Sequence, residues 1–129
     1  MARAREREAK ALLASNQWSG AYYLSGYAVE CGLKSVLVKQ FKTSALPDKR
    51  LVNDAYQHNL QALVGLAGLT QQQSQALNAD PLLRVNWSLT KDWTEASRYR
   101  IWTQLEAEEM VSAITDRQHG VMKWLRSIW

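Results

Sequence analysis

Residues 26–37 read GYAVECGLKSVL, and this stretch decides the fold. Its apolar residues recur at helical spacing, yet Glu30, Cys31 and Lys34 interrupt them within five residues. A core helix has no need of Glu30, and a surface helix has no need of so many apolar side chains. We therefore expect a central helix that carries a polar group at one flank of its buried face.

The central helix is predicted over residues 17–41. One face carries mainly apolar residues, with one glycine and one glutamine, at i, i+3, i+4 and i+7 spacing: Tyr22, Gly26, Val29, Leu33, Val36, Leu37 and Gln40. A neighbouring face carries Tyr23, Tyr27, Glu30 and Lys34. Each glycine within the helix costs about 1 kcal/mol relative to alanine. We expect other helices to pack closely where glycines occur.

Helical spacing extends along the chain, and no stretch alternates as a strand does. The further helices are predicted at residues 2–14, 54–68, 70–78 and 103–127. Asp54 is a possible N-cap, and the pairs Thr70–Gln73 and Thr103–Glu106 form capping-box patterns. Residues 82–101 are predicted to be irregular or briefly helical. The sequence thus predicts one all-α domain over residues 1–129, a bundle of four to five helices with long antiparallel helices two and five.

Composition excludes several classes of protein. The 129 residues are 47% hydrophobic and 22% charged, which is typical of a globular domain rather than a disordered chain. The net charge of +4 permits an anionic partner such as RNA, although a solvated helical surface is the simpler explanation of the dispersed cations. A single cysteine cannot form an internal disulfide and fits a reducing cytoplasm. The uncharged residues 11–29 are too polar to span a membrane, so we expect a cytoplasmic protein with no membrane partner.

Glu30 is the most informative candidate residue, because a partly buried carboxylate needs a partner. Lys34 stands at the favourable i, i+4 spacing, and Arg98 or Arg100 offers better fork geometry. One interpretation is a structural ion pair that holds the tryptophan-rich segment against the central helix. The other is a polar pocket that holds a phosphate or nucleotide beside Tyr27 and Lys34.

The segment DWTEASRYR at residues 92–100 also permits two interpretations. Trp93, Arg98, Tyr99 and Arg100 could stack bases and bind phosphates, or they could pack a polar, aromatic loop over the bundle. Only two histidines occur, so no multi-histidine metal site and no cofactor are expected. Cys31 is expected to be a buried, inert thiol.

Four segments resemble the HEPN domains of prokaryotes. They are AYYLSGYAVECGLKSVL at 21–37, HNLQAL at 58–63, a tryptophan followed after four residues by RYR at 93–100, and KWL near the C-terminal end. The resemblance spans most of the chain and implies a helical bundle that forms a homodimer. It also implies a role in toxin–antitoxin or phage-defence systems, often beside a minimal nucleotidyltransferase. Many members are metal-independent ribonucleases.

The nuclease branch of that family uses an arginine, four to six intervening residues and a histidine. Here seven residues separate Arg50 from His58, and one separates Arg117 from His119. We therefore expect a dimeric module that binds RNA, a nucleotide or a partner protein without cleaving anything.

The sequence leaves two alternative functions open. In one, the chain is a divergent ribonuclease with His58 or His119 as general base and Arg98 or Arg100 on the phosphate. In the other, it is the neutralising partner of a nucleotidyltransferase, with Trp87, Trp93 or Trp129 as interface anchors.

Overall fold

The computed structural model describes residues 1–43 and 58–129, except for the side chains of residues 40–43. This part of the chain is all-helical and contains no strand. Its elements are α1 (Ala2–Ala14), α2 (Trp18–Thr43), α4 (Leu60–Leu66), α5 (Thr70–Ala79), α6 (Pro81–Thr90), the 3₁₀-helix η1 (Glu95–Tyr99), α7 (Gln104–Thr115) and α8 (Val121–Arg126). None of the helices described is long and apolar enough to cross a membrane.

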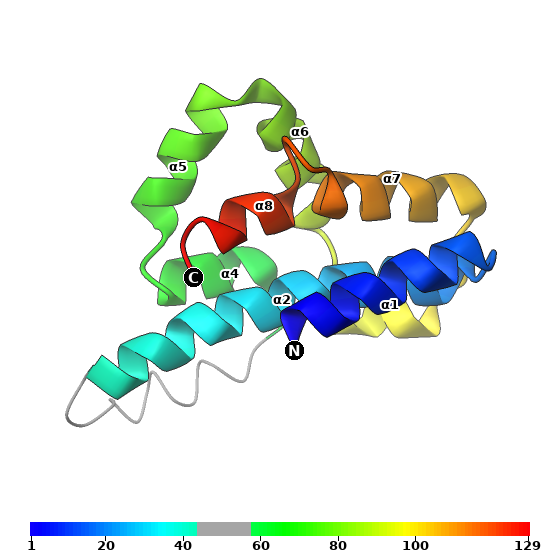
Figure 1. Cartoon of the computed structure of the whole chain (residues 1–129), viewed down its shortest axis with the longest axis horizontal. Coiled ribbons are helices and arrows are strands. Elements are labelled where there is room, and N and C mark those ends of the chain that lie inside the picture. The colour runs from blue at the N-terminus through cyan, green and yellow to red at the C-terminus, as the bar shows by residue number, and fades with distance from the viewer. Residues whose placement is uncertain (44–57) are drawn as a thin grey trace.

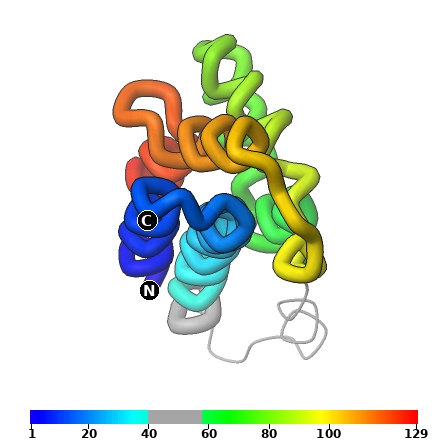
Figure 2. Tube along the Cα trace, turned by 90° about the vertical axis from the view of Figure 1, so that its right-hand side faces the viewer, coloured from blue at the N-terminus to red at the C-terminus, as the bar shows by residue number. Residues whose placement is uncertain are grey.

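Helices α1 and α2 form an antiparallel hairpin at the base of the fold (Figures 1 and 2). Asn16 turns the chain in the left-handed region, at φ 63°, which asparagine tolerates better than most residues. Both helix ends agree with the prediction to within two residues. The predicted face of α2 is buried from Tyr22 to Leu37, and Gln40 lies outside the side chains described.

The C-terminal helices correct the predicted topology. Helix α7 begins beside the start of α2, where the Trp102 N–H donates to Ser19 Oγ at 2.9 Å. Helix α8 ends beside the later turns of α2, where Leu125 and Trp129 lie over Gly32. The α7–α8 limb therefore runs in the same direction as α2 (Figure 1), and the predicted antiparallel pairing of helices two and five is wrong.

The expected long final helix is also broken. It opens with the predicted Thr103–Glu106 capping box, and its apolar residues Ala107, Met110, Val111 and Ile114 are buried. Asp116 ends it early, because Asp116 Oδ1 accepts the backbone N–H groups of Gln118 and His119 at 2.9 and 2.8 Å. This local turn competes with helical hydrogen bonding, and α8 restarts only at Val121.

The middle of the chain contains two further corrections. Helix α4 begins at Leu60 with Asn59 as its side-chain cap, so residues 58 and 59 are not helical; Asp54 lies outside the described residues. Thr70 and Gln73 do not form a capping box, since Leu69 occupies the N-cap of α5.

Residues 82–90, expected to be irregular or briefly helical, belong to the ten-residue helix α6, Pro81–Thr90. Asp80 caps its first turn and Pro81 occupies the position where the missing N–H costs nothing. Asp80 and Pro81 therefore begin α6 directly after the end of α5.

Two glycines explain how the core closes around α2. A Cβ at Gly26 would come within 2.2–2.4 Å of the Trp93 ring, and one at Gly32 within 2.8 Å of the Trp129 ring. The expectation that neighbours approach closely at these glycines is confirmed, although the approaching groups are tryptophan side chains. Trp93 is 1% exposed and therefore part of the core.

Candidate functional site

Glu30 lies on α2 with its side chain only 3% exposed. Its Oε1 is 2.6 Å from His58 Nδ1, and its Oε2 is 3.8 Å from Lys34 Nζ. The predicted Lys34 partner is confirmed. The nearer partner, His58, was named in the sequence analysis only as a candidate general base. Sequence spacing could not predict its contact with Glu30, because the two residues are 28 positions apart.

His58 connects α2 to the tryptophan-rich segment. Its Nε2 is 2.8 Å from Glu95 Oε2, so the imidazole bridges two carboxylates. His58 thus holds the segment against α2, which is the role that the sequence suggested for Arg98 or Arg100.

The two arginines have other partners, and that part of the prediction is wrong. Arg98 lies 3.8 Å from Glu95, and it donates to the Tyr99 hydroxyl at 2.6 Å. This hydrogen bond is the main cause that raises the pKa of Arg98. Its guanidinium also lies over the Tyr99 ring, which is 77% exposed. Arg98 and Tyr99 therefore present a cationic, aromatic surface to solvent.

Arg100 and Trp93 do not belong to this surface. Arg100 lies over the Trp102 ring at 4.1 Å, and its guanidinium is 3.6 Å from Glu106. Trp93 is enclosed between Gly26 and Tyr23 and cannot stack on a ligand. Trp87 is likewise 4% exposed, so neither tryptophan can anchor a partner protein as suggested.

A cavity of about 420 Å³ is lined in part by Glu30. Its lining comes from the later turns of α2 and from the first residue: Met1, Tyr27, Glu30, Cys31, Lys34, Ser35, Val38 and Lys39. Its volume is within the range of small-molecule sites. Burial raises the pKa of the half-buried Cys31 thiol, which disfavours the reactive thiolate. The cavity thus combines Tyr27, Glu30 and Lys34, the three residues that the pocket interpretation grouped.

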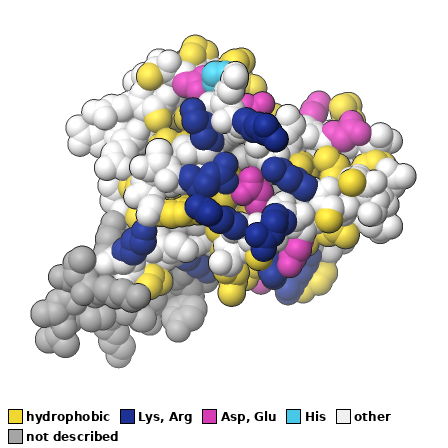
Figure 3. All heavy atoms as spheres, in the orientation of Figure 1, with side chains coloured by type: hydrophobic (Ala, Val, Ile, Leu, Met, Phe, Trp, Pro, Cys, Tyr) yellow, Lys and Arg dark blue, Asp and Glu magenta, His cyan; other side chains and the backbone are white. Residues whose placement is uncertain are grey.

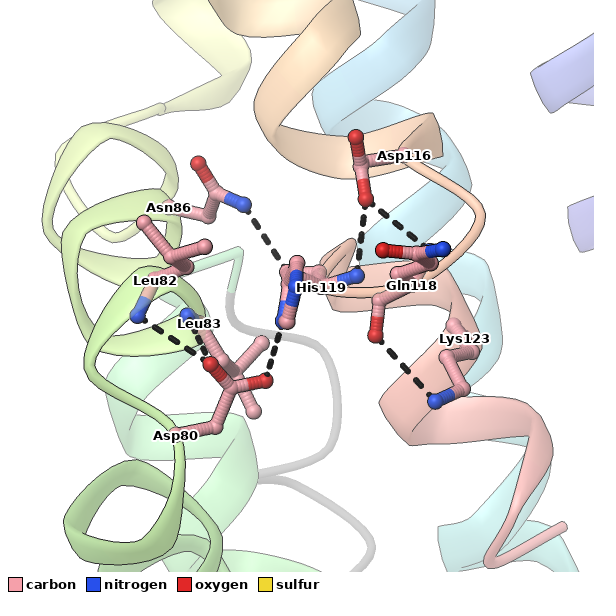
Figure 4. Close-up of polar contacts among 8 residues, drawn as sticks. All are labelled: Asp80, Leu82, Leu83, Asn86, Asp116, Gln118, His119 and Lys123. Atoms are coloured by element: carbon pink, nitrogen blue, oxygen red, sulfur yellow. Dashed lines mark hydrogen bonds and ion pairs between the residues drawn. The ribbon is translucent and has the colours of Figure 1, made fainter.

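A second histidine–carboxylate pair lies at the corner between α5–α6 and α7–α8 (Figure 4). His119 Nδ1 is 2.7 Å from Asp80 Oδ2, and the His119 carbonyl accepts from Asn86 Nδ2 at 2.9 Å. The hydrogen bond with His119 is the main cause that lowers the pKa of Asp80. Neither Arg98 nor Arg100 contacts His119 in the described structure, so the suggested pairing of His119 with either arginine is not formed.

Cationic side chains gather on one face of the molecule. Figure 3 shows Lys and Arg in a band across the face where α1 and α8 lie. On α1, Arg3, Arg7 and Lys10 are exposed at i, i+4 and i+7, and Lys123 is exposed on α8. The α1 cations are close together in the sequence, but only the fold places α8 beside them.

The acidic residues of α1 are already engaged. Glu6 pairs with Arg126 at 2.9 Å and with Lys10 at 4.0 Å, and Glu8 pairs with Arg5 at 2.8 Å. Neither Arg3 nor Arg7 forms an ion pair with any described residue. The band therefore retains cations that are free to meet an external anion.

Within residues 1–43 and 58–129, no cluster of three or more histidine, cysteine or acidic side chains is arranged to hold a metal ion. No protein-family model, curated protein or solved structure matches the chain.

Proposed function

We propose that the chain is a HEPN-like module that binds RNA as a homodimer without cleaving it. The observation that carries this proposal is the band of Lys and Arg side chains on the face of α1 and α8, in which Arg3 and Arg7 form no ion pair with a described residue (Figure 3). Phosphate backbones bind such surfaces by releasing condensed counterions, whatever the base sequence. The cavity beside Glu30 gives a nucleotide an alternative place on the same protein.

The resemblance supports the same assignment. The segments that carry it lie on α2, α4, η1 and α8, and each of the last three packs against α2. Glu30 and Lys34, the polar pair of the characteristic helix, contact each other in the bundle. A toxin–antitoxin or phage-defence setting, with a nucleotidyltransferase encoded nearby, is what this resemblance implies for the cell.

RNA binding is tested by fluorescence anisotropy with an end-labelled single-stranded RNA in EDTA, over a series of salt concentrations. Arg7→Glu changes the band, and Arg84→Glu is its matched control, an exposed arginine on α6 with the same change of charge. The logarithm of the wild-type affinity should fall linearly with the logarithm of salt concentration. Arg7→Glu should weaken binding and reduce the slope by about 0.7, the value for one single-strand phosphate contact.

Arg84→Glu should bind RNA as the wild type does. Equal losses in the two variants would show that only net charge matters, and absence of binding at low salt would overturn the proposal. Intact RNA at the end of each titration is part of the expected result.

The second candidate function is a metal-independent ribonuclease centred on His58. It is favoured by the cluster of His58, Glu95 and Arg98, in which buried Glu30 orients the imidazole through Nδ1. Glu95 would have to leave Nε2 before that nitrogen could accept a proton from the 2′-hydroxyl. His58→Ala and Arg98→Ala should each abolish cleavage in EDTA, by about 10²–10⁴-fold for the base, whereas His119→Ala should not.

A further inference from the structure

Two adjoining hollows lie between α5 and the C-terminal residues 118–128. The larger, of about 590 Å³, is lined by Gln72, Gln75 and Ala76 of α5 and by Trp124, Ser127 and Ile128. The smaller, of about 200 Å³, shares Ala76, Trp124 and Ser127 with it and extends to Lys123 and the Asp80–His119 pair. Because three residues line both hollows, the two form one cleft, which we call the α5–α8 cleft. The volume of its larger part is within the range of small-molecule sites.

Lys123 belongs both to this cleft and to the cationic band on the face of α1 and α8. Its Nζ donates to the Gln118 carbonyl at 3.1 Å (Figure 4), and its exposed side chain forms no ion pair with a described residue. The Asp80 carboxylate at the same end of the cleft is already bound by His119 and by two backbone N–H groups of α6. A phosphate held on the band at Lys123 therefore places the adjoining nucleotide at the cleft.

Trp124 gives the cleft an aromatic wall. Its partly buried ring meets the ring of Trp87 at 66°, with centroids 6.4 Å apart. Trp87 is buried, and its indole N–H donates to Gln61 at 2.8 Å. The core therefore fixes the position of the Trp124 ring. A fixed indole is suited to base stacking, because every nucleobase presents a flat π-face.

The cleft also contains free side-chain amides. Gln72 and Gln75 are exposed on α5, Gln118 is exposed on the α7–α8 turn, and no described residue forms a hydrogen bond with these three amides. Gln73 of the same helix differs, because it is buried and accepts from Gln61 at 2.9 Å. An amide offers both a donor and an acceptor, so it can pair with the edge of an unstacked base.

We propose that the α5–α8 cleft receives an unpaired base of the RNA whose phosphates lie on the cationic band. Trp124 stacks on this base, and the free glutamine amides form hydrogen bonds with its edge. A base within a duplex is paired and stacked on both sides, so it cannot enter the cleft. The bound RNA is therefore single-stranded at this point. This inference deepens the proposed function and rests on it.

The first test compares a labelled single-stranded RNA with the duplex that it forms with its complement, by fluorescence anisotropy at low salt in EDTA. The single strand should bind about tenfold more tightly, the effect of one stacked base. The cationic band alone favours the duplex, which has the higher charge density. Equal or tighter binding of the duplex would overturn the inference.

The second test replaces the aromatic wall. Trp124→Leu and Trp124→Phe both keep an apolar side chain, but only phenylalanine presents an aromatic face. Trp124→Leu should weaken single-strand binding about tenfold, and Trp124→Phe should bind nearly as the wild type does. The dependence of affinity on salt should stay unchanged in both, since stacking releases no counterions. Equal losses in two variants that thermal melts show to be folded would mean that packing, not stacking, is responsible.

The third test leaves the core untouched. Gln75→Glu and Gln71→Glu make the same change of charge at exposed sites of α5, and only Gln75 lines the cleft. Gln75→Glu should weaken binding of the single strand by about fivefold or more, since a hydrogen bond to the base is lost. Gln71→Glu should bind as the wild type does. The same affinity in both variants would contradict the proposed site.

The closing experiment locates the base directly. Single-stranded RNA that carries 5-bromouridine is irradiated in complex with the wild type, and the crosslinked residue is identified by mass spectrometry. The crosslink should form at Trp124 and be absent from Trp124→Leu. RNA that binds with the salt dependence of the band but crosslinks only elsewhere, for example at exposed Tyr99, refutes the cleft and leaves RNA recognition standing. Absence of RNA binding at low salt refutes the proposed function itself.

Discussion

Within the described residues, each of the two histidines contacts a carboxylate through Nδ1, at nearly equal distances and in very different surroundings. His58 Nδ1 is 2.6 Å from Glu30, and His119 Nδ1 is 2.7 Å from Asp80. The Glu30 side chain is 3% exposed, whereas that of Asp80 is 28% exposed. Water can replace the histidine at Asp80 but has little access to Glu30. Nearly equal distances therefore do not mean that the two pairs contribute equally to the free energy of unfolding.

The two pairs also differ in the other hydrogen bonds that their residues form. Asp80 accepts two backbone N–H groups of α6, and the backbone of His119 is held by Asp116 and Asn86 (Figure 4). Glu30 has only side-chain partners, and its position depends on the close contact of α2 with Trp93 one turn earlier. Changes in packing should therefore affect the buried His58–Glu30 pair most. Changes in charge should affect the exposed His119–Asp80 pair most.

The largest effect is expected from Gly26→Ala, which attacks the packing beneath the buried pair. The new Cβ would lie within 2.2–2.4 Å of the Trp93 ring, and Trp93 is 1% exposed. Overpacking of this kind costs about 2 kcal/mol or more, beyond the helix propensity gained. Urea unfolding followed by circular dichroism measures the loss.

Gly20→Ala is the matched control on the same helix. Its Cβ would meet only the flexible end of Leu12, at 3.1 Å. The variant should therefore be as stable as the wild type, or more stable by up to about 1 kcal/mol. Equal stability of the Gly26 and Gly20 variants would show that Trp93 does not restrict α2.

The next effect is expected from His58→Ala, which leaves the buried Glu30 with Lys34 alone. An unsatisfied buried polar group costs about 1–3 kcal/mol, and the 40% exposure of the His58 side chain favours the lower part of this range. The double variant Glu30→Gln/His58→Ala should recover part of the loss, because a neutral amide is less costly to bury. No recovery would mean that packing of the imidazole, rather than the charge of Glu30, determines the stability.

The smallest effect is expected from Asp80→Asn, which removes charge but keeps a good N-cap. The pKa of Asp80 is lower in the folded protein, so folding favours the carboxylate. This stabilisation is fully present above the unfolded pKa of about 3.9 and is lost as pH falls through the folded pKa. Wild type and variant should therefore differ in urea stability at neutral pH and converge in acid.

Because the hydrogen bond with His119 is the main cause of the lowered pKa, His119→Ala should reduce this pH dependence. A difference between wild type and Asp80→Asn that is the same at every pH would contradict the assignment.

The two regions also differ in how much of them could be predicted. The Glu30–Lys34 pair follows from i, i+4 spacing on one helix, and the sequence predicted it together with the cavity residue Tyr27. The partners His58 and Asp80–His119 are separated by long stretches of chain, and no periodicity relates them. Only the packing of α4 and η1 against α2, and of α6 against the α7–α8 turn, brings these side chains together.

The sequence alone predicted the features that depend on residues close together in the chain. Helical periodicity, the bounds of α1, the buried face of α2 and the Thr103 capping box all depend on interactions within a turn or two. The tertiary structure alone decided the parallel course of α2 and the α7–α8 limb, the burial of Trp87 and Trp93, and the joining of α1 and α8 into one basic face. These features depend on which distant surfaces exclude water together, and that is a property of the whole folded chain.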